Sequence, residues 1–230
     1  MTTSRAACYA VWPSRREFLK TSGKVAAASV LAGVAIPAVH AAEDSTIRLA
    51  LIGCGGRGTG AVADAFAAGG GSVRLVAMAD LFEDRLQGSH NRLSKAFAEK
   101  VDVPPERRFV GFDAYKKAID CLGPGDVALL TTHAAFRPMM FEYAVAKGVN
   151  VFAEKSFAVD APATRRWLKA AELSEQKNLK VGVGFMWRHS AAREEVIRRI
   201  HDGEIGDVHT LRIYRVHGPV HCPRRPPNQN

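Results

Sequence analysis

An apolar segment that ends in a glycine-rich turn constrains this chain more than any other feature of its sequence. The segment 47–52 runs directly into Gly53-x-Gly55-x-x-Gly58, and a stretch of small residues follows over 59–68. This is the strand, turn and helix context in which the dinucleotide-binding fingerprint occurs. Gly53 permits the tight turn, Gly55 lets a pyrophosphate approach the backbone, and Gly58 lets the helix pack close to the strand. The sequence therefore predicts an anion site at the N-terminus of that helix.

An acidic residue at the end of a second apolar segment extends this pattern. The segment 73–79 ends at Asp80, which lies 22 residues after Gly58. The fingerprint places its ribose-binding acid at about this distance. The Asp80 carboxylate can accept hydrogen bonds from both ribose hydroxyls and would repel a 2′-phosphate, so we expect NAD in preference to NADP. The alternative is a glycine-rich turn that binds nothing, which requires strand, glycines, helix and acid to coincide by chance.

Residues 1–42 have the pattern of an export signal. The sequence Ser-Arg-Arg-Glu-Phe-Leu-Lys over 14–20 is a twin-arginine motif. An uncharged, Ala- and Gly-rich stretch follows over 25–39, and small residues permit cleavage after Ala41. The alternative, a basic amphipathic helix, is disfavoured by the uncharged stretch. We expect the twin-arginine export machinery to carry the folded, nucleotide-loaded protein to the periplasm or another exported location.

Composition and charge exclude several other classes of protein. The 230 residues carry a net charge of +9, of which +4 belongs to residues 1–42. No Lys/Arg stripe is interleaved with aromatic residues in the remainder, so nucleic-acid binding is not expected. No later apolar run is long enough to span a membrane. The cysteines beyond residue 42 are Cys54, Cys121 and Cys222, an odd and widely spaced set that predicts neither a disulfide framework nor a metal site.

Apolar segments alternate with helical patterns from residue 47 onward. This alternation predicts an α/β fold, a Rossmann-type doubly wound parallel sheet with helices on both faces. A six-stranded sheet is expected, with strands over 47–52, 73–79, 126–132, 149–153 and 180–185; the last three are the fourth, fifth and sixth, and the third is not assigned to residues. Helices are expected over 59–68, 83–100, 113–121, 138–147, 160–177 and 190–201. We expect the cofactor-binding domain over 43–189, and over 190–230 the start of a second α+β domain with a strand at 208–216.

The fifth expected strand delivers Glu154-Lys155-Ser156 to the carboxyl edge of the sheet, where ligands bind in open α/β folds. An ammonium beside a nicotinamide ring can hydrogen-bond a reacting hydroxyl and favour its ionised form as hydride leaves. On position alone, Lys155 is equally well explained as a surface lysine in a loop. His133 lies in the turn after the fourth strand, near the expected position of a cofactor ribose.

With these residues placed, the chain over 47–218 resembles the Gfo/Idh/MocA family of glucose–fructose oxidoreductases and inositol dehydrogenases. The resemblance rests on Gly53-Cys-Gly-Gly-Arg-Gly58, Ala79-Asp80, Ala135-Phe-Arg-Pro-Met-Met140, Val151-Phe-Ala-Glu-Lys-Ser156 and Ile200-His-Asp-Gly-Glu-Ile-Gly206. It implies an NAD(P)-binding Rossmann domain, followed by an α+β domain that forms the substrate site and often a subunit interface. A homo-oligomer is therefore expected where the second domain is present.

The resemblance also assigns roles to single residues. It makes Lys155 the catalytic residue, while Glu154 shapes its loop or binds ribose. No residue is assigned to a metal. The expected cofactor-binding residues are Gly53, Gly55, Gly56, Arg57, Gly58, Asp80, Thr132, His133 and Glu154.

Two features depart from the family pattern. Ser156 stands where the family has proline, which makes a cis peptide bond after Lys155 costly. No Asp-x-x-x-His sequence follows Lys155, although the family places that pair in its second domain. We therefore expect the front part of a longer enzyme that transfers hydride to or from a sugar, polyol or related hydroxyl compound. The alternatives are a glycosidase-like relative that uses NAD transiently and a nucleotide-binding fragment without activity.

Overall fold

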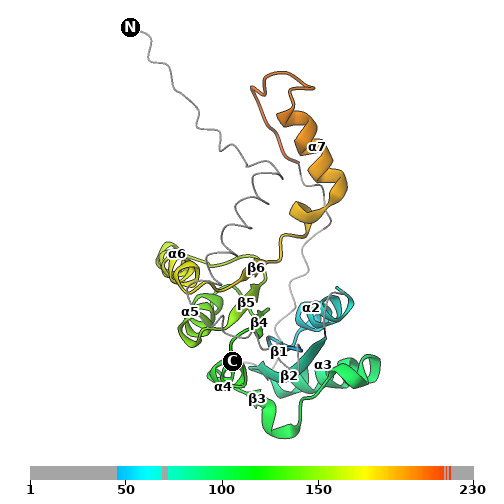
Figure 1. Ribbon diagram of the computed structural model, residues 1–230, viewed down its shortest axis with the longest axis vertical. Coiled ribbons are helices and arrows are strands. Elements are labelled where there is room, and N and C mark those ends of the chain that lie inside the picture. Colours follow the sequence, from blue (N-terminus) through cyan, green and yellow to red (C-terminus); the bar gives the residue numbers. More distant parts are fainter. Residues whose placement is uncertain (1–45, 69–71, 215, 217, 219–230) are drawn as a thin grey trace, which may run out of the picture. The chain divides into compact units, whose positions relative to one another are not determined.

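The computed structural model describes residues 46–68, 72–214, 216 and 218. The predicted export signal lies outside the described residues. Six parallel strands form one sheet in the order β3-β2-β1-β4-β5-β6 (Figure 1). The strands are β1 (Ile47–Ile52), β2 (Val73–Asp80), β3 (Arg108–Val110), β4 (Val127–Leu130), β5 (Asn150–Ala153) and β6 (Val181–Val183).

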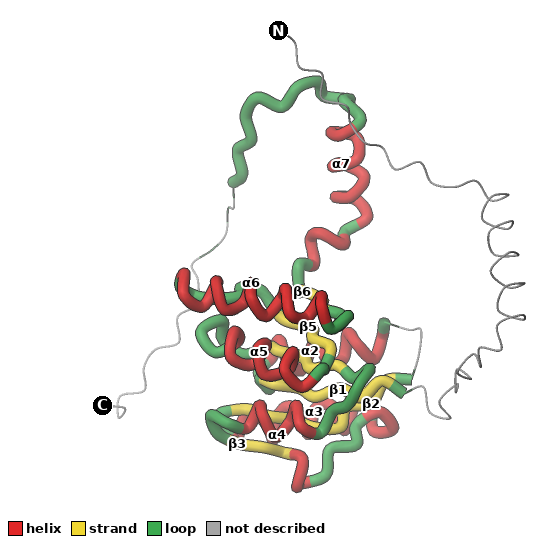
Figure 2. The backbone as a smooth tube through the Cα atoms, turned by 60° about the vertical axis from the view of Figure 1, so that its left-hand side comes forward, coloured by secondary structure: helices red, strands yellow, loops and turns green. Residues whose placement is uncertain are grey.

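Helices connect the strands and cover both faces of the sheet. They are α2 (Gly56–Ala67), α3 (Glu83–Ala96), α4 (Ala114–Asp120), α5 (Arg137–Lys147), α6 (Ala161–Gln176) and α7 (Ala191–His201), with 3₁₀ turns at Ala98–Lys100, Pro105–Arg107 and Met186–His189. Figure 2 shows this alternation of helix and strand along the chain. The predicted doubly wound α/β class, a Rossmann-type fold, is confirmed. Among the described residues, no helix has the length and apolar character needed to cross a membrane.

Alternating residues of the central strands build two separate hydrophobic cores. Leu49 and Leu51 of β1 pack with α2 and α3, whereas Ala50 and Ile52 of the same strand pack with α4, α5 and α6. Phe141 stacks on Trp167 in the second core, with ring centroids 4.2 Å apart. Because both faces of the sheet are buried, its strands are continuous apolar runs and their carboxyl ends are the part left open to ligands.

The chain turns from strand to helix with the signals expected from the sequence. Asp160 is the N-cap of α6 and accepts a hydrogen bond from the Ala163 N–H at 2.7 Å. Gly148 ends α5 in the left-handed conformation. Asp113 occupies the expected N-cap position of α4, but its carboxylate pairs with Lys116 instead of capping the helix.

The structure corrects three details of the expected elements. It adds β3 (Arg108–Val110), a strand that was not assigned to any residues from the sequence. The helix expected over 83–100 ends at Ala96, where Phe97 turns aside to pack edge-on against Phe66. The strand expected over 208–216 is wrong: residues 207–214 have no regular structure and are exposed, and no described strand pairs with them. A lone strand has no partner for its backbone groups, so the alternating pattern alone does not form one.

Candidate functional site

The strand order reverses between β1 and β4, and the glycine-rich turn lies at this point. Gly53 has φ +98°, and a Cβ there would lie 2.8 Å from the Thr132 nitrogen. A Cβ on Gly58 would lie 2.0 Å from the Gly53 carbonyl oxygen. By contrast, a Cβ on Gly55 or Gly56 would meet no atom within 4 Å. Packing therefore requires glycine at positions 53 and 58, whereas Gly55 and Gly56 leave open space in front of the turn.

The first turn of α2 faces that open space with its backbone donors. Gly55 is the N-cap and has no side chain to accept from the N–H groups of the first turn. No acidic residue lies in that turn either. Free N–H groups and the positive end of the helix dipole favour an anion at this position. The predicted phosphate site thus has both the space and the donors that it requires.

Thr131, which belongs to none of the predicted motifs, holds this turn against the end of β4. Its hydroxyl lies 2.6 Å from the Gly53 carbonyl oxygen, and its N–H donates to the Ile52 carbonyl at 2.9 Å. A Cβ on Gly58 would come within 2.6 Å of the same hydroxyl. The sequence signal for this contact was a threonine at the end of a predicted buried strand, since the end of that strand was expected to lie beside the glycine-rich turn.

Asp80 lies at the end of β2 with its carboxylate held from two sides. One oxygen accepts from the Cys54 N–H at 2.6 Å, and the other accepts from the Phe82 N–H at 2.9 Å. The carboxylate is therefore fixed to the glycine-rich turn, and each oxygen keeps a lone pair for a further donor. Burial raises the pKa of the Cys54 thiol, and the Asp80 charge adds to this effect, so this cysteine is protonated and not a reactive thiolate.

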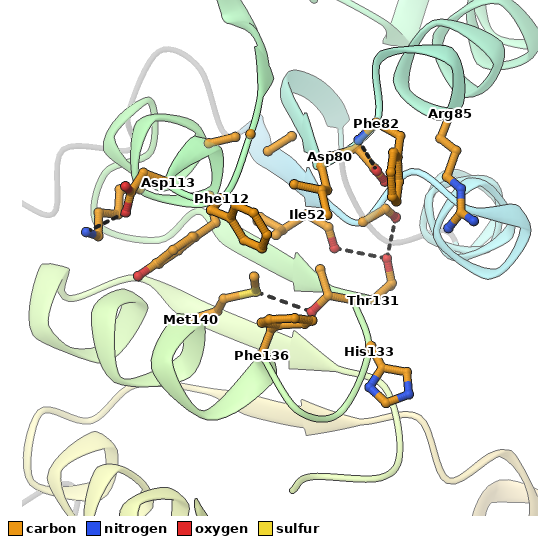
Figure 3. A pocket seen from close by; sticks show the side chains of 18 of the residues that line it. Ile52, Asp80, Phe82, Arg85, Phe112, Asp113, Thr131, His133, Phe136 and Met140 are labelled. Atoms are coloured by element: carbon orange, nitrogen blue, oxygen red, sulfur yellow. Dashed lines mark hydrogen bonds and ion pairs between the residues drawn. The ribbon is translucent and has the colours of Figure 1, made fainter. Parts of the chain in front are cut away.

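A cavity of about 560 Å³ opens beside Asp80 at the ends of β1, β2 and β4. Figure 3 shows the side chains of Phe82, Phe112 and Phe136 around it. The rings of Phe112 and Phe136 lie 6.3 Å apart, and the Arg85 guanidinium lies 5.1 Å from the Phe82 ring centroid. These three rings are at least 40% exposed. Exposed aromatic side chains gathered at one cavity suit a flat, apolar ligand group such as a base.

A second cavity of about 1050 Å³ opens at the ends of β5 and β6. Four residues line both cavities, namely Arg85, Thr131, Thr132 and His133. The two cavities therefore adjoin at the end of β4. Thr132 and His133 line both cavities, and the second cavity also holds Lys155 and His189.

Arg57 and Glu154 join the glycine-rich turn to the end of β5. The Glu154 carboxylate is buried and accepts from Arg57 Nε at 2.6 Å, while Arg57 also pairs with Asp64 at 3.2 Å. The hydrogen bond to Glu154 raises the pKa of Arg57, so the guanidinium stays charged. A Cβ on Gly184 would lie 2.7 Å from Glu154 Oε1, so this carboxylate packs directly against the chain after β6. Glu154 thus shapes this part of the site.

Lys155 follows Glu154 with an exposed side chain that lines the second cavity. Its ammonium forms no ion pair with another described residue, so it remains available to a ligand. The peptide bond between Lys155 and Ser156 is cis, although serine at position 156 was expected to disfavour that form. No group of described residues has the arrangement of a metal site, and none was assigned to a metal.

The fold and the site together define a class of protein. It has a Rossmann-type fold in which the glycine-rich turn and an acidic residue meet at the topological switch point of the sheet. No protein-family model matches the chain, and no curated protein sequence matches it. Solved structures do match, and they are inositol dehydrogenases and related Gfo/Idh/MocA-type sugar oxidoreductases.

Three of these structures illustrate the likeness. Myo-inositol 2-dehydrogenase from Lactobacillus plantarum has 26% identity and a TM-score of 0.56, over 71% of this chain and 43% of that chain. Scyllo-inositol dehydrogenase from Lactobacillus casei, with bound NAD(H) and scyllo-inositol, has 24% identity and a TM-score of 0.54, over 70% and 43%. A 3-ketoreductase variant from Actinomadura kijaniata, with TDP-benzene and NADP, has 21% identity and a TM-score of 0.51, over 71% and 44%. The match thus spans less than half of each of these chains.

Proposed function

We propose that this chain binds a nicotinamide dinucleotide and acts in hydride transfer on a sugar, polyol or related hydroxyl compound. The observation that carries this proposal is the pair of adjoining cavities at the switch point. They extend from Asp80, past the open space at Gly55, to Lys155. A dinucleotide has two nucleosides joined by a pyrophosphate, which matches two cavities joined beside a helix N-terminus.

The residues present fit such a cofactor. The aromatic side chains of Phe82, Phe112 and Phe136 suit the adenine base, and the fixed carboxylate of Asp80 suits its ribose. The pyrophosphate would meet the N–H groups of the first turn of α2, where the open glycines leave room. The nicotinamide end would then lie in the second cavity, near Thr132, His133 and Lys155.

We further propose that the cofactor is NAD rather than NADP. A 2′-phosphate adds about 1.5 to 2 negative charges. Asp80 is held in place by two backbone N–H groups, so its carboxylate cannot turn away without losing those bonds. Lys116 and Arg85 also line the cavity, but Lys116 pairs with Asp113 and Arg85 lies over the Phe82 ring. Neither cation neutralises Asp80, so the repulsion between carboxylate and phosphate would persist.

Lys155 has the role of stabilising the reacting oxygen. The bound cofactor supplies a hydride acceptor or donor at the nicotinamide end. The Lys155 ammonium would donate a hydrogen bond to the substrate oxygen and stabilise the negative charge that develops there. Asp64 and Glu154, the two acids that line this cavity, are both paired with Arg57, so Lys155 meets no competing carboxylate among the residues described.

Turnover of the 230-residue chain tests this function. A panel of sugars and polyols is incubated with NAD while the absorbance of the reduced cofactor is followed. We expect turnover that Lys155→Ala lowers by at least about 100-fold, the lower range for a general acid–base group. Lys169→Ala is the matched control, because Lys169 is exposed on α6 and lines neither cavity. NAD binding without turnover would instead assign this chain a nucleotide-binding role. Glycoside cleavage with tightly held NAD would favour the glycosidase-like alternative.

Export is a separate proposal that rests on the sequence. The twin-arginine motif over 14–20 and the uncharged stretch over 25–39 support transport of the folded protein by the twin-arginine machinery.

A further inference from the structure

A buried arginine joins the two loops that border the second cavity. Arg137 is the first residue of α5 and is only 3% exposed. One terminal nitrogen of its guanidinium donates to the carbonyl oxygens of Glu154 and Ser156, and the other donates to the carbonyl oxygen of Thr132. The first two acceptors follow β5, and the third follows β4. One side chain therefore links the ends of two neighbouring strands.

Two of the acceptors flank the proposed catalytic lysine in the sequence. Glu154 and Ser156 are the residues immediately before and after Lys155. Hydrogen bonds to both of their carbonyl groups fix the backbone on either side of the lysine, while its own side chain stays exposed in the cavity. Ser156 has no ring to restrict its backbone, so the restraint on this segment comes from outside it.

A guanidinium suits this set of contacts, because the three carbonyl oxygens are reached from two separate nitrogens. Its planar fork carries five N–H donors in fixed directions, whereas a lysine ammonium is a single charged point on a flexible stem. The group is also costly to bury, since burial lowers the pKa of Arg137 and the nearby Glu154 carboxylate opposes this only in part. Arg137 Nε has no hydrogen-bond partner among the described residues. An apolar side chain would leave the carbonyl oxygens of Glu154, Ser156 and Thr132 without this donor, so the carbonyl contacts are the property that distinguishes arginine.

We propose that Arg137 is a positioning residue for Lys155: it holds the Glu154–Ser156 backbone against the end of β4, so that the lysine points into the second cavity. This inference deepens the proposed function and rests on it for the role of Lys155. Positioning matters because a displacement of about 1 Å at a reacting group can lower a rate by about 100-fold.

The first test needs no enzymatic activity. Trypsin can cut after Lys155, which is exposed, but it does not cut at residue 137 in either form because Pro138 follows. We expect Arg137→Lys in the 230-residue chain to speed cleavage after Lys155 at least tenfold, while Arg166→Lys leaves it unchanged. Arg166 is a matched control, because it is an exposed arginine that also contacts α5, through Glu142. Equal cleavage rates in wild type and Arg137→Lys would overturn the proposal.

If the Arg137→Lys variant does not fold, trypsin cleavage of the wild-type protein still tests the proposal. The bond after Lys155 should be cut at least tenfold more slowly than the bond after Arg188, which is also exposed and lies in the 3₁₀ turn after β6. If the two bonds are cut equally fast, the backbone beside Lys155 is not held and the proposal is wrong.

The second test separates positioning from a general structural role. We expect Arg137→Lys to lower kcat at least tenfold and to change the dissociation constant for NAD less than threefold. In a Lys155→Met background the same substitution should change kcat less than twofold, since an effect that acts through Lys155 disappears with it. Full additivity would contradict the proposal. A wild type without turnover would instead refute the proposed function, and the trypsin result would still decide whether Arg137 holds the segment.

Discussion

The four glycines of the turn should separate into two functional groups when each is changed to alanine. The added Cβ at Gly58 would lie 2.0 Å from the Gly53 carbonyl oxygen and 2.6 Å from the Thr131 hydroxyl. Both neighbours are bonded to each other at 2.6 Å, so neither can move independently. Overpacking of this kind costs about 1–3 kcal/mol, and we expect the upper value because one neighbour is backbone. A loss of about 3 kcal/mol lowers the melting temperature of a domain of this size by about 6–12 °C.

Gly55→Ala should behave in the opposite way. Its φ of −70° and ψ of −178° are allowed for alanine, and the added Cβ meets no atom within 4 Å. Lower entropy of the unfolded chain and a poorer N-cap nearly cancel, so we expect stability to change by less than about 0.5 kcal/mol. The Cβ occupies the space assigned to the pyrophosphate, and we expect NAD affinity to fall at least tenfold, a loss of about 1.4 kcal/mol.

Thermal unfolding and NAD titration of the same samples measure both effects. Gly88→Ala on α3 is the matched control, because its Cβ also meets nothing within 4 Å and it lines neither cavity. It should retain NAD affinity, and its stability should rise by about 0.5–1 kcal/mol because alanine replaces glycine in the interior of a helix. The reasoning is refuted if Gly58→Ala melts like wild type, or if Gly55→Ala binds NAD as tightly as Gly88→Ala does.

Three further substitutions test the remaining assignments. Asp80→Ser removes the charge that opposes a 2′-phosphate, so the ratio of NADP to NAD dissociation constants should fall at least tenfold in fluorescence titrations; an unchanged ratio would remove Asp80 from cofactor selection. Lys155→Ala should leave NAD affinity within about threefold of wild type while lowering turnover at least about 100-fold, because its ammonium acts on the substrate oxygen and not on the phosphates. Replacing Arg15 and Arg16 by lysine should abolish export of a reporter that must fold first, and an unchanged periplasmic signal would show that the motif is incidental.

The sequence was sufficient to predict the parts of the fold that depend on local patterns. Buried parallel strands are apolar runs bounded by turn residues, so β1, β2 and β5 were found within about one residue of their bounds. Asp160 begins α6 by accepting a hydrogen bond at its N-terminus, and Gly148 ends α5 because glycine adopts the left-handed conformation readily. By contrast, β3 has three residues, two of them half-buried and one exposed, and too few for any period to show.

The site was predictable only where one short motif contains the whole feature. The glycines and Asp80 follow a fixed spacing, and the structure joins them through the Cys54 N–H. The aromatic residues Phe112 and Phe136 come from separate loops, so their proximity depends on the folded sheet. Arg137 likewise acts on carbonyl groups 17 and 19 residues away along the chain, and carbonyl acceptors have no signature in a sequence. Its burial could not be read from a charged residue type.

Calorimetric titration of the 230-residue chain with NAD tests the central claim most directly, because both cavities and the turn are assigned to one ligand. The account predicts saturable binding of one NAD per chain, weakened at least tenfold by Gly55→Ala and unaffected by Gly88→Ala. The absence of NAD binding by a chain that still unfolds cooperatively, or binding that Gly55→Ala leaves intact, would contradict it.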